Sequence, residues 1–343
     1  MPTPPRVSRE VRLAALPDGL PGPEHFEIAE TPLPTPGDGQ ALVRNRFFHV
    51  FAALRTLIGG GVDGAPFPPL RPGDTLFGAA VGEVVSAPEG SGLRPGDLVS
   101  HWLGWREYAA VDVTGCTPLD GSLPDPAAHL AHGRLAYTAL TRDAEIRPGD
   151  TVFVSGGGGA VGSMAGQIAR LLGAGRVIGS TGSPEKAARL VSELGYDAAV
   201  VRGAGPIGEQ LARVAPDGVD VLLDNVGGEQ LRAAVAAARP GARFVLVGAL
   251  SGQLSPHGSG TEAPVELDSY RLILRQVTIR GFGGTDGPDD PDGLPRWNER
   301  FGDWLRSGDL TFPHVRVRGI ENAPRALHEV FHGRHLGTVI VEL

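Results

Sequence analysis

Short apolar runs separated by turns dominate the first 125 residues of the chain. Residues 41–43 and 81–85 form two of these runs, and the segments between them are rich in proline and glycine. Apolar, β-branched runs bounded by such residues are typical of strands. Arg-Pro-Gly-Asp occurs three times, each time before an apolar run, and Pro followed by Gly fits the centre of a type II turn. This part of the chain is therefore predicted to be a β-rich domain.

From residue 151 onwards the pattern changes, because apolar strands now alternate with stretches of helical character. Predicted strands cover 152–154, 177–179, 219–223 and 244–247, and predicted helices cover 163–172, 187–194 and 231–238. Such alternation is typical of βαβ units and predicts a parallel sheet. The remaining elements expected are a surface loop at 285–295, helices at 297–307 and 323–331, and a last strand at 338–343.

The length of the chain indicates how many domains it has, and its net charge indicates which kinds of partner it binds. The chain has 343 residues, of which 41% are hydrophobic, so two domains are expected. Its formal net charge of -8, with no basic stripe, disfavours nucleic acid and anionic membranes as partners and favours a small molecule. The first ten residues carry charges and prolines where a signal peptide needs an apolar stretch, and no apolar run is long enough to span a bilayer. A cytoplasmic location is expected.

A glycine-rich loop lies between the first predicted strand of the second half and the helix after it. It contains the pattern G-x-G-x-x-G at Gly157, Gly159 and Gly162, with Ala160 and Val161 inside it. Glycines at these positions allow a tight turn and a close approach to a pyrophosphate, which the free N–H groups of the helix attract. The loop is predicted to bind a dinucleotide. The alternative is a glycine-rich turn that binds no ligand.

The residues after the next strand indicate which dinucleotide is bound. A fold specific for NAD carries an acidic residue there for the adenosine ribose, and this chain has none. It has instead Ser180, Thr181 and Lys186, the only lysine of the chain, with Arg202 expected after the following strand. These side chains can donate hydrogen bonds or charge to a 2′-phosphate, so the predicted cofactor is NADPH. A solvated surface position is the alternative for Lys186.

Four segments resemble one enzyme family. Residues 152–199, DNVGGEQL at 224–231, the stretch 78–85 and GDLVSHWLGWREYAAVD at 96–112 are similar to prostaglandin reductases and to curcumin and 2-alkenal reductases, the zinc-independent branch of the medium-chain dehydrogenases/reductases. The resemblance implies an α/β fold in which a GroES-like, β-rich catalytic domain, 1–125 and 310–343, surrounds a doubly wound Rossmann domain, 126–309. It also implies NADPH-dependent reduction of activated, α,β-unsaturated double bonds in small carbonyl compounds, and a homodimer.

The resemblance carries over unevenly to single residues. The positions that match family positions around phosphate or nicotinamide are the glycine loop, Lys186, Asn225, Val247, Gly248, Ala249, Phe282 and Gly283. Other positions depart: the family's Asp-Pro is Phe51-Ala52 here, its catalytic tyrosine is Gln253, and its terminal Asn-x-Gly-Lys begins with His335. The cofactor-binding residues are therefore expected to act as they do in the family, and His335 is counted among them. The substrate-facing residues are expected to differ from those of the family.

Two residues are candidates for the chemistry at the substrate. Tyr137 can donate a proton, whereas Gln253 can only orient a carbonyl, because an amide does not release a proton at neutral pH. His49, His101, His129 and His132 fall in segments expected near the pocket, where a structural role is the more common outcome for a single histidine.

No metal is expected. Cys116 is the only cysteine, and Gly82-Glu83 lacks the histidine that zinc-dependent relatives place between these residues. His328, His332 and His335 recur at helical spacing, which we interpret as a solvated helix face. Two alternatives to double-bond reduction stay open: a quinone oxidoreductase, and a crystallin-like protein that binds NADPH without catalysis.

Overall fold

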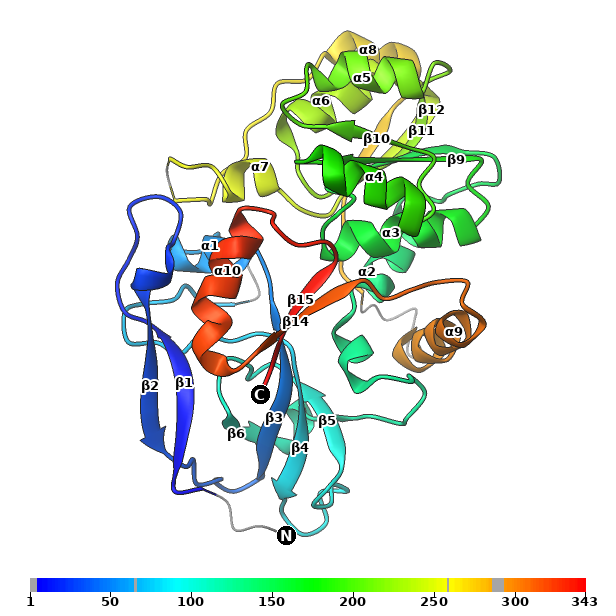
Figure 1. Cartoon of the computed structure of the whole chain (residues 1–343). Helices are drawn as coiled ribbons and strands as arrows, with labels where there is room; N and C mark the ends of the chain where they lie inside the picture. The colour runs from blue at the N-terminus through cyan, green and yellow to red at the C-terminus, as the bar shows by residue number, and fades with distance from the viewer. Residues whose placement is uncertain (1–4, 65–66, 258, 286–292) are drawn as a thin grey trace.

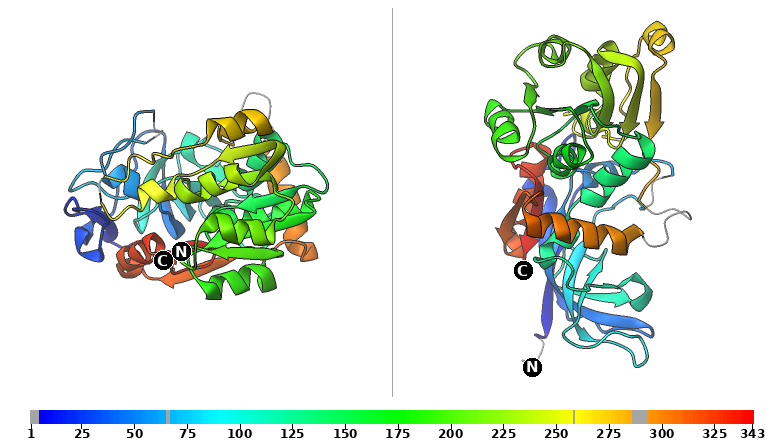
Figure 2. Two further views of the ribbon diagram at one scale, coloured as in Figure 1. Left: turned by 90° about the horizontal axis from the view of Figure 1, so that it is seen from above. Right: turned by 90° about the vertical axis from the view of Figure 1, so that its right-hand side faces the viewer.

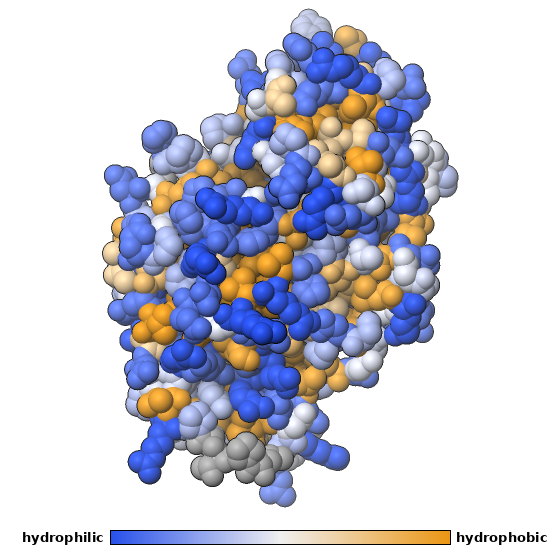
Figure 3. All heavy atoms as spheres, viewed as in Figure 1, coloured by the Kyte–Doolittle hydropathy of each residue, from blue (hydrophilic) through white to orange (hydrophobic). Residues whose placement is uncertain are grey.

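The computed structural model describes residues 5–64, 67–257, 259–285 and 293–343. It divides into a β-rich domain that contains both ends of the chain and a second domain with an open sheet and helices (Figure 1). Polar side chains cover most of the face seen in Figure 3, with smaller apolar areas between them. Among the described residues, no helix combines the length and apolar character needed to cross a bilayer.

A seven-stranded sheet forms the centre of the first domain. Its strand order is β14-β15-β3-β4-β5-β7, and β6 pairs with β3 beside this path. The bounds are β3 (Gln40–Val50), β4 (Ala80–Ser86), β5 (Leu98–His101), β6 (Tyr108–Asp112), β7 (Thr117–Pro118), β14 (His314–Arg318) and β15 (Thr338–Glu342). Strand β15 pairs antiparallel with β3, so that Ile340 lies opposite His49. Strand β15, near the end of the chain, thus completes a sheet whose first strand in sequence begins at Gln40.

The three Arg-Pro-Gly-Asp segments form equivalent turns, as predicted. In each, the aspartate side chain accepts a hydrogen bond from the arginine N–H at 2.7–2.8 Å, and the aspartate N–H donates to the arginine carbonyl. The glycines have φ angles of 95°, 95° and 87°. These positive angles fit the third position of a type II turn, which glycine occupies without steric cost.

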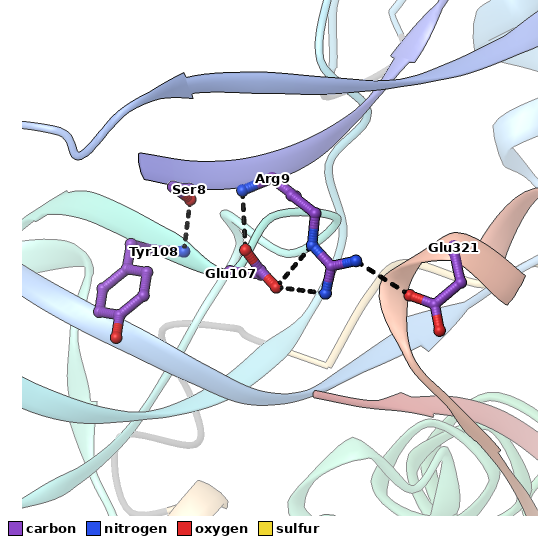
Figure 4. A network of polar contacts seen from close by, with 5 residues as sticks. All are labelled: Ser8, Arg9, Glu107, Tyr108 and Glu321. Atoms are coloured by element: carbon purple, nitrogen blue, oxygen red, sulfur yellow. Dashed lines mark hydrogen bonds and ion pairs between the residues drawn. The ribbon is translucent and has the colours of Figure 1, made fainter. Parts of the chain in front are cut away.

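A two-stranded ribbon, β1 (Val7–Leu13) and β2 (Phe26–Pro32), is attached to this domain by an ionic network (Figure 4). The Arg9 guanidinium donates to Glu107 Oε1 at 2.7 Å and to Glu321 Oε2 at 3.2 Å. The Ser8 hydroxyl accepts from the Tyr108 N–H at 3.2 Å. The ribbon is therefore joined both to the loop before β6 and to the C-terminal part of the chain.

The second domain contains the parallel sheet predicted from the sequence. Its strand order is β10-β9-β8-β11-β12-β13. The strands are β8 (Thr151–Val154), β9 (Arg176–Thr181), β10 (Ala198–Val201), β11 (Val219–Asp224), β12 (Ala238–Leu246) and β13 (Thr278–Gly281). The chain leaves β8 towards β9 and β10 and then returns to the other side of β8. The strand order reverses between β8 and β11, and ligands of such sheets bind at the carboxyl ends of the strands at this point.

Helices cover both faces of this sheet (Figure 2). They are α3 (Ala160–Leu171), α4 (Pro184–Glu193), α5 (Ile207–Val214), α6 (Gly228–Ala236) and α8 (Ser269–Arg275). Alternating strand residues explain the two layers, because Val152 and Val154 pack into one buried cluster with Met164 of α3, whereas Phe153 packs into another with Leu211 of α5. Strands buried on both sides are typical of parallel sheets.

Several element boundaries differ from the sequence prediction. The helix predicted over 231–238 ends at Ala236, since the chain already enters β12 at Ala238. Helix α4 begins three residues earlier than predicted, because the Ser183 hydroxyl accepts the Lys186 N–H at 3.2 Å and caps it. Residues 286–292 of the predicted surface loop lie outside the described residues, and 293–295 already belong to α9 (Gly293–Ser307). Helix α10 covers Ala323–Phe331, as predicted.

Candidate cofactor and substrate site

The glycine loop joins the carboxyl end of β8 to the start of α3. The Gly156 N–H donates to Ser180 Oγ at 2.8 Å, and the Gly157 N–H donates to the Ser180 carbonyl at 2.7 Å, so β9 supports the loop from below. A Cβ atom at Gly162 would lie 2.3 Å from the Gly156 carbonyl oxygen, which explains the third glycine of the motif. A Cβ at Gly159 would meet only that same oxygen, at 3.3 Å.

The consequence is an open anion site above the loop. Gly159 is exposed and precedes Ala160 and Val161, the first residues of α3, which are partly exposed. The first N–H groups of this twelve-residue helix have no partner within the helix. A pyrophosphate placed there receives these N–H groups and the positive end of the helix dipole, while Gly159 leaves room for it.

Asp224 and Ser155, which were not among the predicted site residues, connect the two strands at the switch point. Asp224 Oδ1 accepts the Ser155 hydroxyl at 2.5 Å and the N–H groups of Val226 and Gly227, both at 3.0 Å. The predicted cofactor residue Asn225 donates from Nδ2 to the Ser155 carbonyl at 2.7 Å. This buried network fixes the loops after β8 and β11 relative to each other. The sequence offers only a weak indication of this network. Ser155 follows one apolar strand and Asp224 ends another.

The end of β9 holds the residues predicted for a 2′-phosphate, and they divide into two groups. Ser180 is fully buried, and its hydroxyl pairs with the Gly156 N–H and the Gln230 side chain, so it supports the glycine loop and does not face the phosphate position. Thr181 is the last residue of β9, and its own carbonyl accepts the Arg202 N–H at 2.8 Å.

Lys186 and Arg202 form a pair of cations beside this strand end. Burial lowers the pKa of Lys186, and the Arg202 charge lowers it further. No carboxylate of the described residues forms an ion pair with either side chain. A Cβ at the intervening Gly182 would lie 3.3 Å from the Arg202 guanidinium. Glu185 acts on Lys186 only through its charge, and two neighbouring cations of the described residues outside any ion pair favour an anion between them, as a 2′-phosphate requires.

The segment before β15 reaches over from the first domain to this region. Lys186 Nζ donates to the carbonyls of Gly333 and, at 3.1 Å, His335, while the Gly337 N–H donates to the Gly158 carbonyl at 3.0 Å. The His335 ring contacts Glu329 at 2.8 Å instead of the cofactor position, so only its backbone lies beside Lys186. The three C-terminal histidines do not form part of a metal-binding group among the described residues.

The remaining predicted cofactor residues lie at the carboxyl ends of β12 and β13. The N–H groups of Val247 and Gly248 donate to the Asp224 carbonyl at 2.7 and 3.1 Å, which places the 247–249 turn against β11. Phe282 donates its N–H to the Leu246 carbonyl at 2.9 Å, and Gly283 follows it. Both turns, like the glycine loop, lie at the carboxyl ends of the parallel strands. A dinucleotide binds along this edge in such sheets.

Tyr137 does not have the environment predicted for a proton donor. Its hydroxyl accepts a hydrogen bond from Arg300 Nη1 at 2.5 Å, and its ring packs against Trp297 with centroids 5.6 Å apart. Both partners lie on α9, so α2 (Gly133–Thr138) directs this side chain to a helix–helix contact. Gln253, at the end of α7 (Leu250–Gln253), donates from Nε2 to the Thr56 hydroxyl at 3.1 Å and joins the two domains.

Aromatic rings collect in the first domain where β3 ends. Phe51 stacks on His49 with ring centroids 5.5 Å apart, and His49 lies 4.6 Å from the His132 ring. Nearby, Phe67 contacts Phe77 and Trp102 at 5.1 and 5.0 Å, and Trp102 is 52% exposed. The Gly78 N–H donates to the Trp102 carbonyl, and a Cβ at Gly78 would lie 2.9 Å from Phe51, so the two groups of rings adjoin. We call these rings the aromatic wall: Phe51, Phe67, Phe77 and Trp102.

Comparisons with known proteins find matches in both domains. Residues 9–119 match the family model of the N-terminal domain of oxidoreductases, and residues 160–297 match that of zinc-binding dehydrogenases. The chain is 33% identical to YfmJ of Bacillus subtilis over 98% of this chain and 97% of that protein. It is 28% identical to the NADPH-dependent curcumin reductase of Escherichia coli, covering 96% of this chain and 95% of the reductase.

A solved structure supports the same assignment. CurA from Vibrio vulnificus in complex with NADPH superposes with a TM-score of 0.85 at 29% sequence identity, covering 97% of this chain and 98% of CurA. The family models match parts of both domains, and the matches to YfmJ, the curcumin reductase and CurA cover nearly the whole chain. The chain therefore belongs to the medium-chain dehydrogenases/reductases, in the zinc-independent branch that contains the curcumin, prostaglandin and 2-alkenal reductases.

Proposed function

We propose that this protein is an NADPH-dependent reductase of activated, α,β-unsaturated double bonds in small carbonyl compounds. The observation that carries the proposal is the line of cofactor positions from the Lys186–Arg202 pair, over the open glycine loop, to the 247–249 and 282–283 turns. The relatives named for NADPH-dependent reduction, which match nearly the whole chain, support it.

The residues of the chain fit NADPH in three places. Lys186 and Arg202 hold the 2′-phosphate, the N–H groups at the start of α3 hold the pyrophosphate, and Asn225 with the 247–249 turn lies beside the nicotinamide position. The bound cofactor supplies the hydride. The protein supplies orientation, because the network of Asp224 and Ser155 fixes the loops on both sides of the switch point.

The aromatic wall supports a flat, conjugated acceptor. Partly buried phenylalanines and an exposed tryptophan offer faces against which a planar molecule packs with little loss of side-chain entropy. Binding the acceptor between this wall and the nicotinamide position excludes water and brings its double bond close to the hydride.

Quinone reduction is the second candidate, and the surroundings of Tyr137 and Gln253 favour it. Gln253, at the position of the family's tyrosine, has no acidic proton, and Tyr137 is directed towards a contact with α9. The reduced oxygens of a quinone take protons from water readily. The decisive experiment measures NADPH oxidation with chalcone, cyclohexenone and para-benzoquinone. Turnover of the quinone alone would replace the first candidate by the second, and turnover of none would reject both.

We also propose that two copies of the chain associate through the β13 edge of the parallel sheet. Strand β13 pairs with β12 on one side only, and no other strand of the described residues pairs with it. Helix α8, directly before it, exposes Tyr270, Ile273 and Leu274 by 75%, 69% and 75%. An unpaired strand edge next to exposed apolar side chains favours strand addition by a second copy.

A further inference from the structure

His49 and His132 bring two imidazole rings together at the junction of the domains. His49 lies near the end of β3 in the first domain, where its N–H donates to the Ala79 carbonyl at 2.9 Å. His132 precedes α2, which packs on α3 of the second domain. The ring centroids are 4.6 Å apart, and the planes are inclined by 56°. We call them the histidine pair.

The segment that carries His132 also reaches the nicotinamide end of the cofactor path. Arg134, two residues further on, donates to the Thr285 carbonyl at 3.3 Å, and Arg142 donates to the Gly284 carbonyl at 2.6 Å. These carbonyls follow the Phe282-Gly283 turn directly. On its other side the pair adjoins the aromatic wall, since Phe51 stacks on His49. The histidine pair thus lies between the proposed acceptor surface and the hydride end of the cofactor path.

One buried ring nitrogen of the pair lacks a hydrogen-bond partner. His132 Nδ1 is buried and makes no hydrogen bond, and His49 is only 4% exposed. Throughout the described part of the chain, no hydrogen bond reaches a ring nitrogen of His49, and the two rings do not bond to each other. An unpaired buried polar atom costs about 1–3 kcal/mol, and native proteins leave few of them. The unpaired Nδ1 of His132, beside a His49 ring that makes no hydrogen bond, indicates a site for a polar ligand atom.

Both rings are neutral at ordinary pH. Burial lowers the pKa of His49 well below its usual value, and the neighbouring His132 lowers it further. Burial lowers the pKa of His132 to about 4. A neutral imidazole carries one N–H donor, so the pair can present two donors without introducing a charge.

We propose that the histidine pair binds the carbonyl oxygen of the acceptor and stabilises the negative charge that develops on it during reduction. This inference rests on the proposed function, because it assigns the donors for the same reaction. It makes Gln253 and Tyr137 unnecessary for oxyanion binding, in agreement with their other partners.

The reaction balances as follows. Hydride adds to the carbon β to the carbonyl, and the electrons of the carbon–carbon double bond shift to form an enolate, whose oxygen accepts hydrogen bonds from the histidine N–H groups. The histidines keep their protons, since a neutral imidazole is too weak an acid to release its N–H. Water then protonates the α-carbon, giving the saturated ketone and NADP⁺. One hydride and one proton are consumed for each molecule reduced.

The test replaces the donors and keeps the ring volume. His49→Phe and His132→Phe should each lower kcat with chalcone and NADPH about a hundredfold, as removal of an oxyanion donor does elsewhere. The Kd of NADPH should stay within about twofold. His49→Gln retains an N–H donor and should recover part of the rate. The matched control is His129→Gln, three residues before His132, which should leave kcat unchanged.

A binding measurement tests the pair without turnover. Para-nitrophenol added to the NADP⁺ complex should bind as its yellow phenolate in the wild type, and the double variant H49F/H132F should lose this spectral shift. A double variant that keeps both the phenolate shift and kcat within about threefold would overturn the inference. If the wild type binds the phenolate and reduces no acceptor of the panel, the proposed reaction fails and the oxyanion site stands. If it shows neither, both fail.

Discussion

Lys186 has two sets of neighbours: backbone carbonyls from the first domain and the expected position of the 2′-phosphate. Its ammonium group bonds the carbonyls of Gly333 and His335, yet it also lies beside Arg202 where a 2′-phosphate is expected. Lys186→Ala should weaken NADPH binding about ten- to hundredfold and change NADH binding little, because only the phosphate interaction distinguishes the cofactors. Titration of NADPH and NADH fluorescence measures both affinities.

The control lies on the same helix. Arg189→Ala removes a charge that is paired with Glu193 at 2.7 Å, and it should leave the ratio of the two affinities unchanged. Equal losses for NADPH and NADH in Lys186→Ala would show that this residue acts through the contact between the domains, and the phosphate assignment would then be wrong.

Substitutions at Gly159 and Gly162, in the same loop, should affect different properties: cofactor binding at Gly159 and folding stability at Gly162. Gly159→Val should abolish NADPH binding and lower the Tm by only a few degrees, since its side chain points into the open anion site. Gly162→Ala should cost about 1–3 kcal/mol of folding free energy, because its Cβ meets the Gly156 carbonyl at 2.3 Å. Thermal melts and NADPH titration report the two effects. Normal NADPH binding by a folded Gly159→Val variant would contradict the placement of the pyrophosphate.

At the scale of elements, local patterns predicted the strand, loop and helix around the glycines, since the spacing of residues within fifteen positions determines that unit. The orientation of Tyr137 was not predictable in this way, because its partner Arg300 lies 163 residues further along the chain. Ser180 likewise has a polar side chain at a plausible position, and only the contact with Gln230 across the sheet shows that it is a structural residue. Helix α5, helix α8 and strand β14 were not predicted, since these segments are only five to eight residues long and contain charged residues.

The α8–β13 edge leads to a prediction about assembly. Ile273→Asp places a charge in the exposed apolar face of α8 and should convert a dimer into monomers of 35.7 kDa in light scattering coupled to gel filtration. Val191→Asp alters an equally apolar, 46% exposed residue of α4 and should leave the dimer intact. A wild type that elutes as a monomer, or an Ile273→Asp variant that stays dimeric, would disprove the proposed interface.

For the whole molecule, buried histidines make stability depend on pH. Burial lowers the pKa of His101 to about 4, so the unfolded chain binds a proton between roughly pH 6.5 and 4 that the folded chain does not. The contribution of this residue to the free energy of unfolding is therefore fully present above about pH 6.5 and is lost as the pH decreases through this window. The loss from His101 between pH 7 and pH 5 is about 2 kcal/mol. The lowered pKa values of His49 and His132 add to it in the same direction.

Denaturant unfolding at the two pH values checks this. His101→Asn keeps an acceptor for the Leu103 N–H, now 3.1 Å from Nδ1, and removes the titrating ring, so it should reduce the difference in unfolding free energy. His257→Asn changes an exposed histidine and should preserve the difference. An unaltered pH dependence in His101→Asn would show that this ring does not titrate on unfolding.

The position of β15 has a consequence for synthesis on the ribosome. The parallel sheet ends with β13 at Gly281, whereas the first sheet lacks β14 and β15 until the last thirty residues have emerged. A nascent chain can complete its nucleotide-binding half while β3 still presents an unpaired edge to solvent. Because the segment before β15 also supplies the contacts to Lys186 and Gly158, translation must finish before the two halves can close around a cofactor.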